Sequence, residues 1–248
     1  MENSLDRELD SIVRIQRQLL SGVPRDTEGI SFALRYAPCA RAGGDFYNIR
    51  ATKEHHYAVS IADIEGHGAG AAIVMAMFRA WLGAFRLGWQ PIETVASGIN
   101  ALWNEVSSLS SFATAAFLEV NVQTGLIRSI NCGHPPILVV ATNGNVRELL
   151  HDSTVPLGIL PELPNPIVND QLVPGETLVL YTDGITEAWN AERAQFGIDR
   201  FREVLQSVAA QSDLEGAADA VMGKIEQFRA GEPQSDDQCL LFARIMQR

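Results

Sequence analysis

The sequence predicts an α+β fold in which antiparallel β-sheets are sandwiched between pairs of helices. The predicted helices come in two consecutive pairs, residues 69–87 with 92–107 and residues 198–210 with 214–228, and do not alternate with strands. Short turns separate the strands between these pairs, as in antiparallel hairpins. Because 46% of the 248 residues are apolar, the chain can bury a sizeable core. We therefore expect one large domain.

The first predicted helix covers residues 4–20 and carries a stripe with the spacing of a coiled coil and one polar member. The stripe consists of Leu5, Leu9, Ile12, Gln16 and Leu19. Two interpretations stay open: a homodimer through residues 4–20, or a helix that docks the stripe on its own domain. Gly22 and Pro24 end the helix, so we separate an N-terminal coiled-coil or linker helix (1–22) from the main domain (23–248).

Alternating or continuous apolar runs predict the strands. They cover residues 30–38, 55–61, 112–122, 126–131, 137–141, 146–149, 176–182 and 238–245, and a further strand follows Asp45. The proline-rich stretch 156–166 is predicted to be a loop.

Composition excludes several classes of protein. A net charge of −11 argues against binding nucleic acid through its phosphates. The longest apolar run ends at Arg79 and is too short for a membrane span, and the acidic N-terminus does not resemble a secretory signal. Cys39, Cys132 and Cys239 form no disulfide framework. We expect a cytoplasmic protein that binds neither nucleic acid nor a membrane.

Aspartates recur at the boundary between an apolar strand and a polar turn. A single aspartate there is usually a turn former or a helix cap, but several that converge would repel one another unless cations compensate their charge. Oxygen ligands on rigid elements are what a hard divalent cation needs. The set consists of Asp45 after Gly43-Gly44, Asp63 before Gly66-His67-Gly68, Asp183 before Gly184, and Asp236 beside Asp237.

Several short motifs together resemble one family, the metal-dependent PPM phosphatases with the protein phosphatase 2C-like fold, in their bacterial RsbU/SpoIIE-type branch. They occur in the order of that family. The motifs are Ala42-Gly-Gly-Asp-Phe-Tyr47, Ala62-Asp-Ile-Glu-Gly-His-Gly68, Asn131-Cys-Gly-His-Pro-Pro136, Leu180-Tyr-Thr-Asp-Gly-Ile-Thr-Glu187 and Asp236-Asp237.

This resemblance implies a sandwich of two antiparallel sheets flanked by helix pairs, with two Mn²⁺ or Mg²⁺ ions in the catalytic site. It implies attack on a phosphate ester by a metal-bridging hydroxide, with Asp45 and Asp63 acting through metal-bound water. The implied ligands are Asp45, Asp63 as the bridge, the Ile64 carbonyl, Asp183 and Asp236, with Asp237 and Gly184 as secondary candidates.

The resemblance also implies a substrate class. Relatives of this branch dephosphorylate phosphoserine or phosphothreonine on an anti-sigma-factor antagonist of the STAS type in partner-switching pathways, often under a sensor or regulatory partner. Two alternatives stay open: a non-catalytic module that binds a phosphoprotein, and a hydrolase of small phosphomonoesters.

Four further residues bear on the predicted site. Arg41 is the candidate to hold the phosphate, with a plain surface role as the alternative. Asn48, Glu65 and Cys239 depart from the pattern of the family, and we expect Glu65 to face solvent.

Overall fold

Two five-stranded sheets form the centre of the computed structural model, which describes residues 4–20, 22–24, 27–66, 68–106, 112–149, 154–164 and 166–246. All hydrogen-bonded strand neighbours are antiparallel. The first sheet consists, in spatial order, of β1 (Ile30–Ala37), β10 (Gln238–Ile245), β9 (Thr177–Tyr181), β6 (Leu138–Val140) and β7 (Val146–Glu148). The second consists of β2 (Phe46–Ala51), β3 (His56–Ile64), β4 (Ala113–Asn121), β5 (Leu126–Cys132) and β8 (Val168–Gln171).

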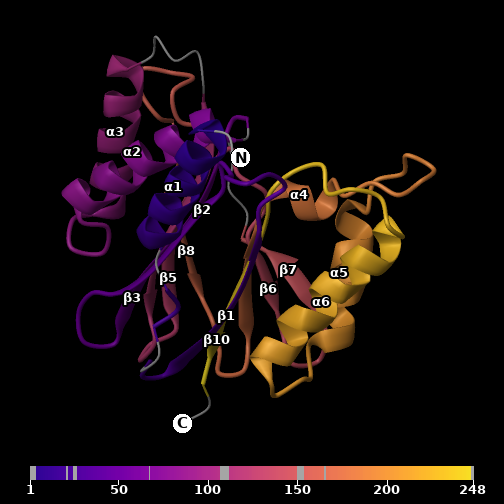
Figure 1. Ribbon diagram of the computed structural model, residues 1–248. Coiled ribbons are helices and arrows are strands. Elements are labelled where there is room, and N and C mark those ends of the chain that lie inside the picture. Colours follow the sequence, from indigo (N-terminus) through magenta and orange to yellow (C-terminus); the bar gives the residue numbers. More distant parts are fainter. Residues whose placement is uncertain are drawn as a thin grey trace.

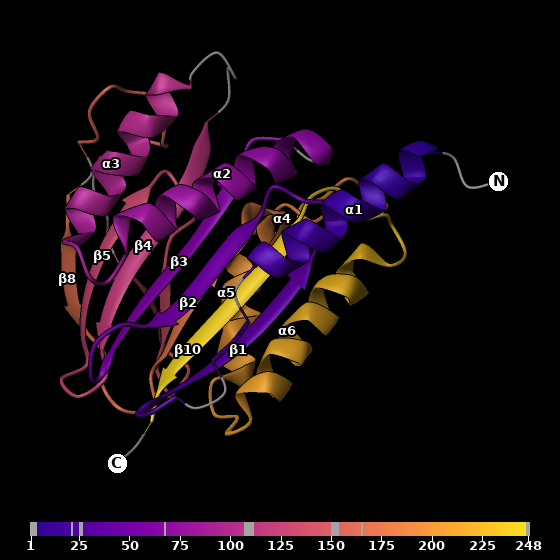
Figure 2. The same cartoon turned by 60° about the vertical axis from the view of Figure 1, so that its left-hand side comes forward.

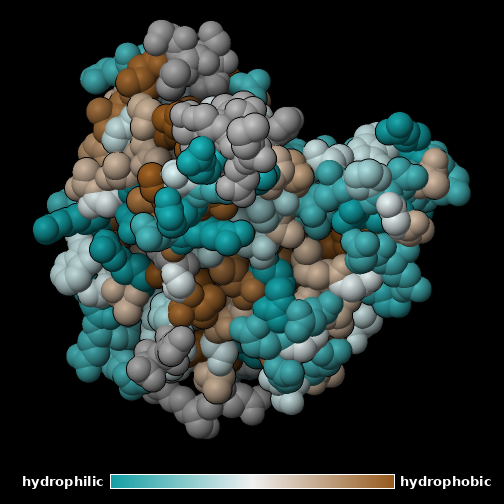
Figure 3. Space-filling view, viewed as in Figure 1, coloured by the Kyte–Doolittle hydropathy of each residue, from teal (hydrophilic) through white to brown (hydrophobic). Residues whose placement is uncertain are grey.

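Helix pairs cover the outer faces of both sheets and give the domain four layers (Figures 1 and 2). The second sheet is covered by α2 (Ala69–Phe85) and α3 (Ile92–Glu105), and the first by α5 (Gly197–Val208) and α6 (Leu214–Arg229). One apolar cluster fills the space between the sheets, and one lies between each sheet and its helices. The solvent side of α5 and α6 is largely hydrophilic (Figure 3). The predicted fold class is confirmed.

Strand β3 illustrates how the sequence produces these layers. Successive side chains of a strand point to opposite faces, and both faces of β3 are buried. Val59 and Ile61 enter the cluster between the sheets, whereas Ala58 and Ala62 enter the cluster under the helices. The small alanines leave room for large side chains such as Phe78 of α2. Among the described residues, no helix is both long and apolar enough to cross a lipid bilayer.

Two elements differ from the sequence-based expectation. Strand β8 was not predicted; it pairs with β5 at the edge of the second sheet, and its short polar sequence Val168-Asn-Asp-Gln171 lacks an apolar pattern because an edge strand is only partly buried. A four-residue helix, α4 (Asp183–Thr186), follows β9 where only a turn was expected.

The N-terminal helix α1 (Ser4–Leu19) lies against α2 (Figure 2). Gln16, the polar member of the predicted stripe, is 5% exposed, and its Nε2 donates a hydrogen bond of 2.5 Å to the carbonyl of Gly43. Arg79 of α2 donates to the carbonyl of Leu19 at 3.2 Å. These contacts favour docking on the helix's own domain, and dimerisation stays a prediction. Residues 1–3 and 21 of the predicted segment lie outside the described residues.

Candidate metal centre

The register of the second sheet brings Asp45 and Asp63 together. Phe46 of β2 stands opposite Ala62 of β3, so continuing the register by one residue places Asp45 opposite Asp63. Residues directly opposite in an antiparallel pair have Cα atoms about 4.5–5.5 Å apart and side chains on the same face. The two carboxylates that the sequence separates by a hairpin are therefore cross-strand neighbours.

The first sheet places the other acidic residues at the ends of two adjacent strands. Asp183 follows β9 and begins α4, and Asp236 with Asp237 precedes β10. The two strand ends are joined by the hydrogen bond from the Thr182 amide to the Cys239 carbonyl, 3.0 Å long. α4 packs so closely on the start of β10 that a Cβ at Gly184 would lie 2.0 Å from the Asp237 carbonyl oxygen. Only glycine permits this approach.

A hydrogen bond between the sheets completes the convergence. The Thr182 hydroxyl donates to Oδ2 of Asp45 at 2.7 Å and accepts from the amide of Cys239 at 2.9 Å. Asp45 is only 1% exposed. The carboxylate of the second sheet is thus held by the strand end of the first, at the edge where both sheets carry acidic residues.

The carboxylates at this edge raise one another's pKa values. Burial, followed by the charge of Asp63, raises the pKa of Asp45 well above its ordinary value. Burial and the charges of Asp183 and Asp236 raise the pKa of Asp63. Burial and the charges of Asp236 and Glu187 raise the pKa of Asp183 to about 6. Hydrogen bonds oppose the shifts of Asp45 and Asp183, and no basic side chain of the described residues is among the causes of the three shifts.

This donor set fits hard divalent cations. Carboxylate oxygens are the ligands such ions prefer, and their positive charge would offset the mutual repulsion that raises the pKa values. The nearby Tyr36 hydroxyl is buried without a hydrogen-bond partner. No three acidic, histidine or cysteine side chains of the described residues stand as a ready ligand group. The charges of Asp63, Asp183 and Asp236 act on the pKa values of their neighbours, so these carboxylates lie within electrostatic range of one another.

Asp237 has a different environment from the other aspartates. It is 3% exposed, and its Oδ1 accepts from the amide of Cys39 at 2.7 Å while its Oδ2 accepts from the amide of Gly44 at 2.6 Å. A Cβ at Gly43 would lie 2.1 Å from Oδ2. Asp237 therefore fixes the loop that carries Asp45.

The other candidates occupy distinct positions. A Cβ at Gly44 would lie 2.5 Å from the Ile64 carbonyl oxygen, so that carbonyl faces the loop that leads to Asp45. Arg41 is exposed, and its guanidinium lies 3.5 Å from the carboxylate of Asp10 of α1. Asn48 is buried in β2 opposite Ser60, and Glu65 is exposed, as expected. His67 lies outside the described residues.

Sequence reasoning missed two contributors. Thr182, which orients Asp45, and Glu187, whose charge acts on Asp63 and Asp183, both belong to the motif 180–187. Their position near Asp183 in that motif could have marked them as candidate site residues. The residue type alone, a threonine or a glutamate, does not predict either role.

Solved structures share this architecture. The SiaA-PP2C domain of Pseudomonas aeruginosa is similar with a TM-score of 0.83 at 22% identity, over 98% of this chain and 99% of that chain. RsbX in complex with magnesium is similar with a TM-score of 0.67 at 14% identity, over 89% and 98% of the two chains. The fold is therefore that of PP2C-type phosphatase domains.

Comparison with known sequences identifies the family to which the chain belongs. Phosphoserine phosphatase RsbP of Bacillus subtilis (strain 168) is 24% identical over 243 residues, which are 96% of this chain and 58% of RsbP. Protein IcfG of Synechocystis sp. is 25% identical over 225 residues, which are 80% of this chain and 35% of IcfG. The chain thus spans only part of the length of these relatives. A profile of the family described as Stage II sporulation protein E (SpoIIE) matches residues 53–246, and the chain belongs to this family.

Proposed function

We propose that this chain is a metal-dependent serine/threonine protein phosphatase of the PPM type. The observation that carries the proposal is the meeting of Asp45 and Asp63 of one sheet with Asp183 of the other at one edge of a PP2C-type sandwich. Their pKa values are raised by burial and by one another's charges, and no basic side chain of the described residues is among the causes. Such an arrangement is costly without cations, and groups with perturbed pKa values concentrate at functional sites.

The residues divide into ligands and supports. Asp45, Asp63, the Ile64 carbonyl, Asp183 and Asp236 would hold two Mn²⁺ or Mg²⁺ ions. Bound ions of this kind supply an activated water nucleophile near neutral pH and positive charge for the phosphate. Thr182 orients Asp45, because its hydroxyl donates to that carboxylate. Asp237 holds the loop before Asp45 through backbone amides.

Thiol nucleophiles are poor candidates in this chain. Burial, followed by the charge of Asp237, raises the pKa of Cys39 to about 12, and burial with the charge of Asp45 raises the pKa of Cys239. A thiolate is the reactive form of cysteine, so these thiols stay protonated near neutral pH. The raised pKa values of Cys39 and Cys239 thus support the proposal that water, and not a thiol, attacks the phosphate.

We further propose that the substrate is a phosphoserine or phosphothreonine on a STAS-type anti-sigma-factor antagonist. The support is the similarity to RsbP, a phosphoserine phosphatase that matches nearly the whole chain. A sensor or regulatory partner would act from outside the domain. Cytoplasmic location, the division at residue 22 and a homodimer through residues 4–20 stay predictions; light scattering of the full chain tests the dimer.

The proposed activity is tested by phosphate release from a phosphorylated antagonist domain during a Mn²⁺ titration. We expect release that depends on the metal, is lost in Asp45→Asn and is kept in Glu203→Gln, which changes an exposed carboxylate of α5. Binding of the phosphoprotein without hydrolysis at any Mn²⁺ or Mg²⁺ concentration would identify a non-catalytic module. Faster turnover of sugar phosphates than of the phosphoprotein would identify a small-molecule hydrolase.

A further inference from the structure

We propose that a basic and aromatic pocket, remote from the carboxylates, binds a nucleoside diphosphate. The pocket has a volume of about 480 Å³ and is lined by Arg50, Ala51, Gly83, Arg86 and Trp89. Binding pockets for small molecules commonly measure about 300–1,000 Å³. We call it the arginine pocket.

The arginine pocket is separate from the candidate metal centre. Arg50 lies on β2 five residues after Asp45, which precedes that strand. At about 3.3 Å per residue, the two Cα atoms are roughly 16 Å apart. Arg86 likewise follows the C-terminal end of α2, whereas the N-terminal end of α2 follows the Asp63 motif. A ligand in this pocket therefore does not contact the carboxylates.

The positive charge of the pocket is not neutralised by neighbouring acids. Arg79 lies next to the lining residue Gly83, since its Nη1 would be 3.4 Å from a Cβ on Gly83, and burial together with the charge of Arg50 lowers the pKa of Arg79. In the described part of the chain, no ion pair joins Arg50, Arg79 or Arg86 to a carboxylate. Other arginines are paired with acids in this chain of net charge −11, among them Arg35, Arg128, Arg147, Arg202 and Arg229. Concentrated, uncompensated guanidinium groups favour a multivalent anion such as a diphosphate.

The backbone at Arg86 supports a role for its side chain. Arg86 caps α2 in the left-handed conformation, with φ 52° and ψ 60°, where glycine is the usual residue. A side chain at this backbone position is strained, and strained positions concentrate at functional sites. The following turn packs closely on Thr52, because a Cβ on Gly88 would lie 2.4 Å from Cγ2 of Thr52, and the Trp89 amide donates to the Arg86 carbonyl at 2.8 Å. The turn therefore places Arg86 and Trp89 beside each other.

Trp89 supplies a surface for a flat ring. It is 54% exposed, and within the described residues it makes no ring–ring or cation–π contact. Bases stack on exposed aromatic side chains whatever their sequence. The guanidinium groups can bind the phosphates of a ligand, and the exposed indole of Trp89 can stack on a base. Together they fit a nucleoside diphosphate better than inorganic phosphate.

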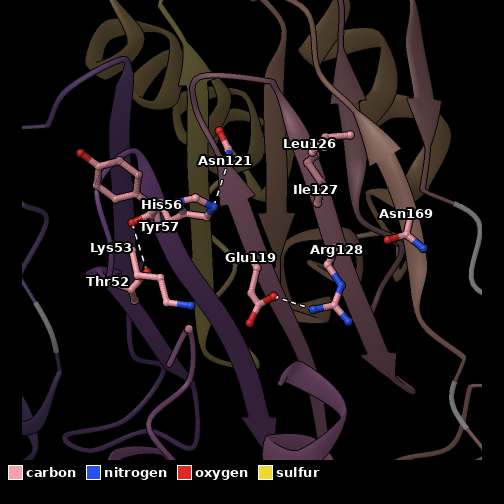
Figure 4. A pocket seen from close by; sticks show the side chains of 11 residues that line it. Thr52, Lys53, His56, Tyr57, Glu119, Asn121, Leu126, Ile127, Arg128 and Asn169 are labelled. Carbon is pink, nitrogen blue, oxygen red and sulfur yellow. Dashed lines mark hydrogen bonds and ion pairs between the residues drawn. The ribbon is translucent and has the colours of Figure 1, made fainter. Parts of the chain in front are cut away.

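A neighbouring pocket of about 330 Å³ offers a contrast (Figure 4). There Arg128 pairs with Glu119 at 3.1 Å and with Glu93 at 3.2 Å, and His56 is hydrogen-bonded to Asn121. Lys53 also lines this second pocket, and its charge, like that of Arg128, acts on Glu119. The basic groups of this pocket thus face acidic groups, unlike those of the arginine pocket.

Calorimetric titration of the full chain with ADP, in buffer containing EDTA to exclude divalent ions, tests the proposal. We expect one site, weakened about tenfold or more by Arg50→Ala and by Arg86→Gly. Arg86→Gly is the matched variant, since glycine suits the left-handed backbone and removes the arginine side chain without adding backbone strain. Trp89→Ala should weaken ADP but leave pyrophosphate unchanged, and Arg14→Ala, an exposed arginine of α1, should change neither.

Three results would overturn the proposal. They are the absence of ADP binding at millimolar concentration, unchanged affinity in both Arg50→Ala and Arg86→Gly, and pyrophosphate binding as tight as ADP. The last result would reduce the pocket to a simple anion site and remove the nucleoside from the proposal. Melting temperatures of the variants identify any loss of fold.

Discussion

Replacing Asp183 by asparagine should stabilise the metal-free protein and at the same time strongly reduce its phosphatase activity. The pKa of Asp183 is raised from 3.8 to about 6, chiefly by burial and by the charge of Asp236. Between these values the folded chain binds more protons than the unfolded chain, so its free energy of unfolding falls as pH rises through that window. Each pKa unit corresponds to about 1.4 kcal/mol, which gives an upper bound of about 3 kcal/mol. Because Asp183 is partly exposed, solvent screening reduces the expected gain at pH 8 to about 1 kcal/mol.

Thermal unfolding in EDTA at pH 8 and pH 5 measures this effect. For a domain of this size, about 1 kcal/mol corresponds to a rise in melting temperature of about 2–4 °C, and the rise should shrink toward pH 5. Excess Mn²⁺ at pH 8 should stabilise the parent protein more than Asp183→Asn. Phosphate release should fall about a hundredfold or more. A lower metal-free melting temperature at pH 8, or near-parental activity, would refute the placement of Asp183 among repelling carboxylates.

Three further substitutions, and Gly223→Ala as a control, test the contacts around the candidate metal centre and the backbone strain at Arg86. Thr182→Val removes the hydroxyl that donates to Asp45 and should cost about 1–3 kcal/mol of unfolding free energy, measured by urea denaturation; an unchanged midpoint would contradict the bond. Gly184→Ala, whose Cβ would lie 2.0 Å from the Asp237 carbonyl, should destabilise by more than about 2 kcal/mol, whereas Gly223→Ala, on the open surface of α6, should not. Arg86→Gly should raise the melting temperature by relieving about 1 kcal/mol of backbone strain, and a decrease would mean that its side chain stabilises the fold.

The layers of the fold could be predicted because they follow from local patterns. The helix pairs and most strands have apolar periodicities that do not depend on distant residues, as in β3, where both faces are buried. β8 could not be predicted, since its pairing with β5 and not its own composition makes it a strand. Similarly, α4 depends on the glycine contact with the start of β10.

The acidic residues of the candidate site could be located in the sequence, but their separate environments could not. Asp236 and Asp237 are adjacent and chemically identical. Only the fold shows that the carboxylate of Asp237 accepts hydrogen bonds from the amides of Cys39 and Gly44. In the sequence, Gln16 is the one polar residue of a coiled-coil stripe. In the structure, its side chain donates a hydrogen bond to the carbonyl of Gly43, which lies 27 residues further along the chain. Such contacts depend on tertiary geometry, which a one-dimensional pattern does not contain.

The bonds that cross between the sheets have a mechanical consequence. Thr182 with Asp45 and Asp237 with Gly44 fasten the two halves of the sandwich at the very edge where the acidic groups meet. Sliding one half past the other by a single residue, about 3.3 Å, would break both fastenings and pull the acidic groups apart. The relative position of the two sheets and the assembly of the acidic edge are therefore coupled. A force that shears the sheets past each other would also separate the acidic groups.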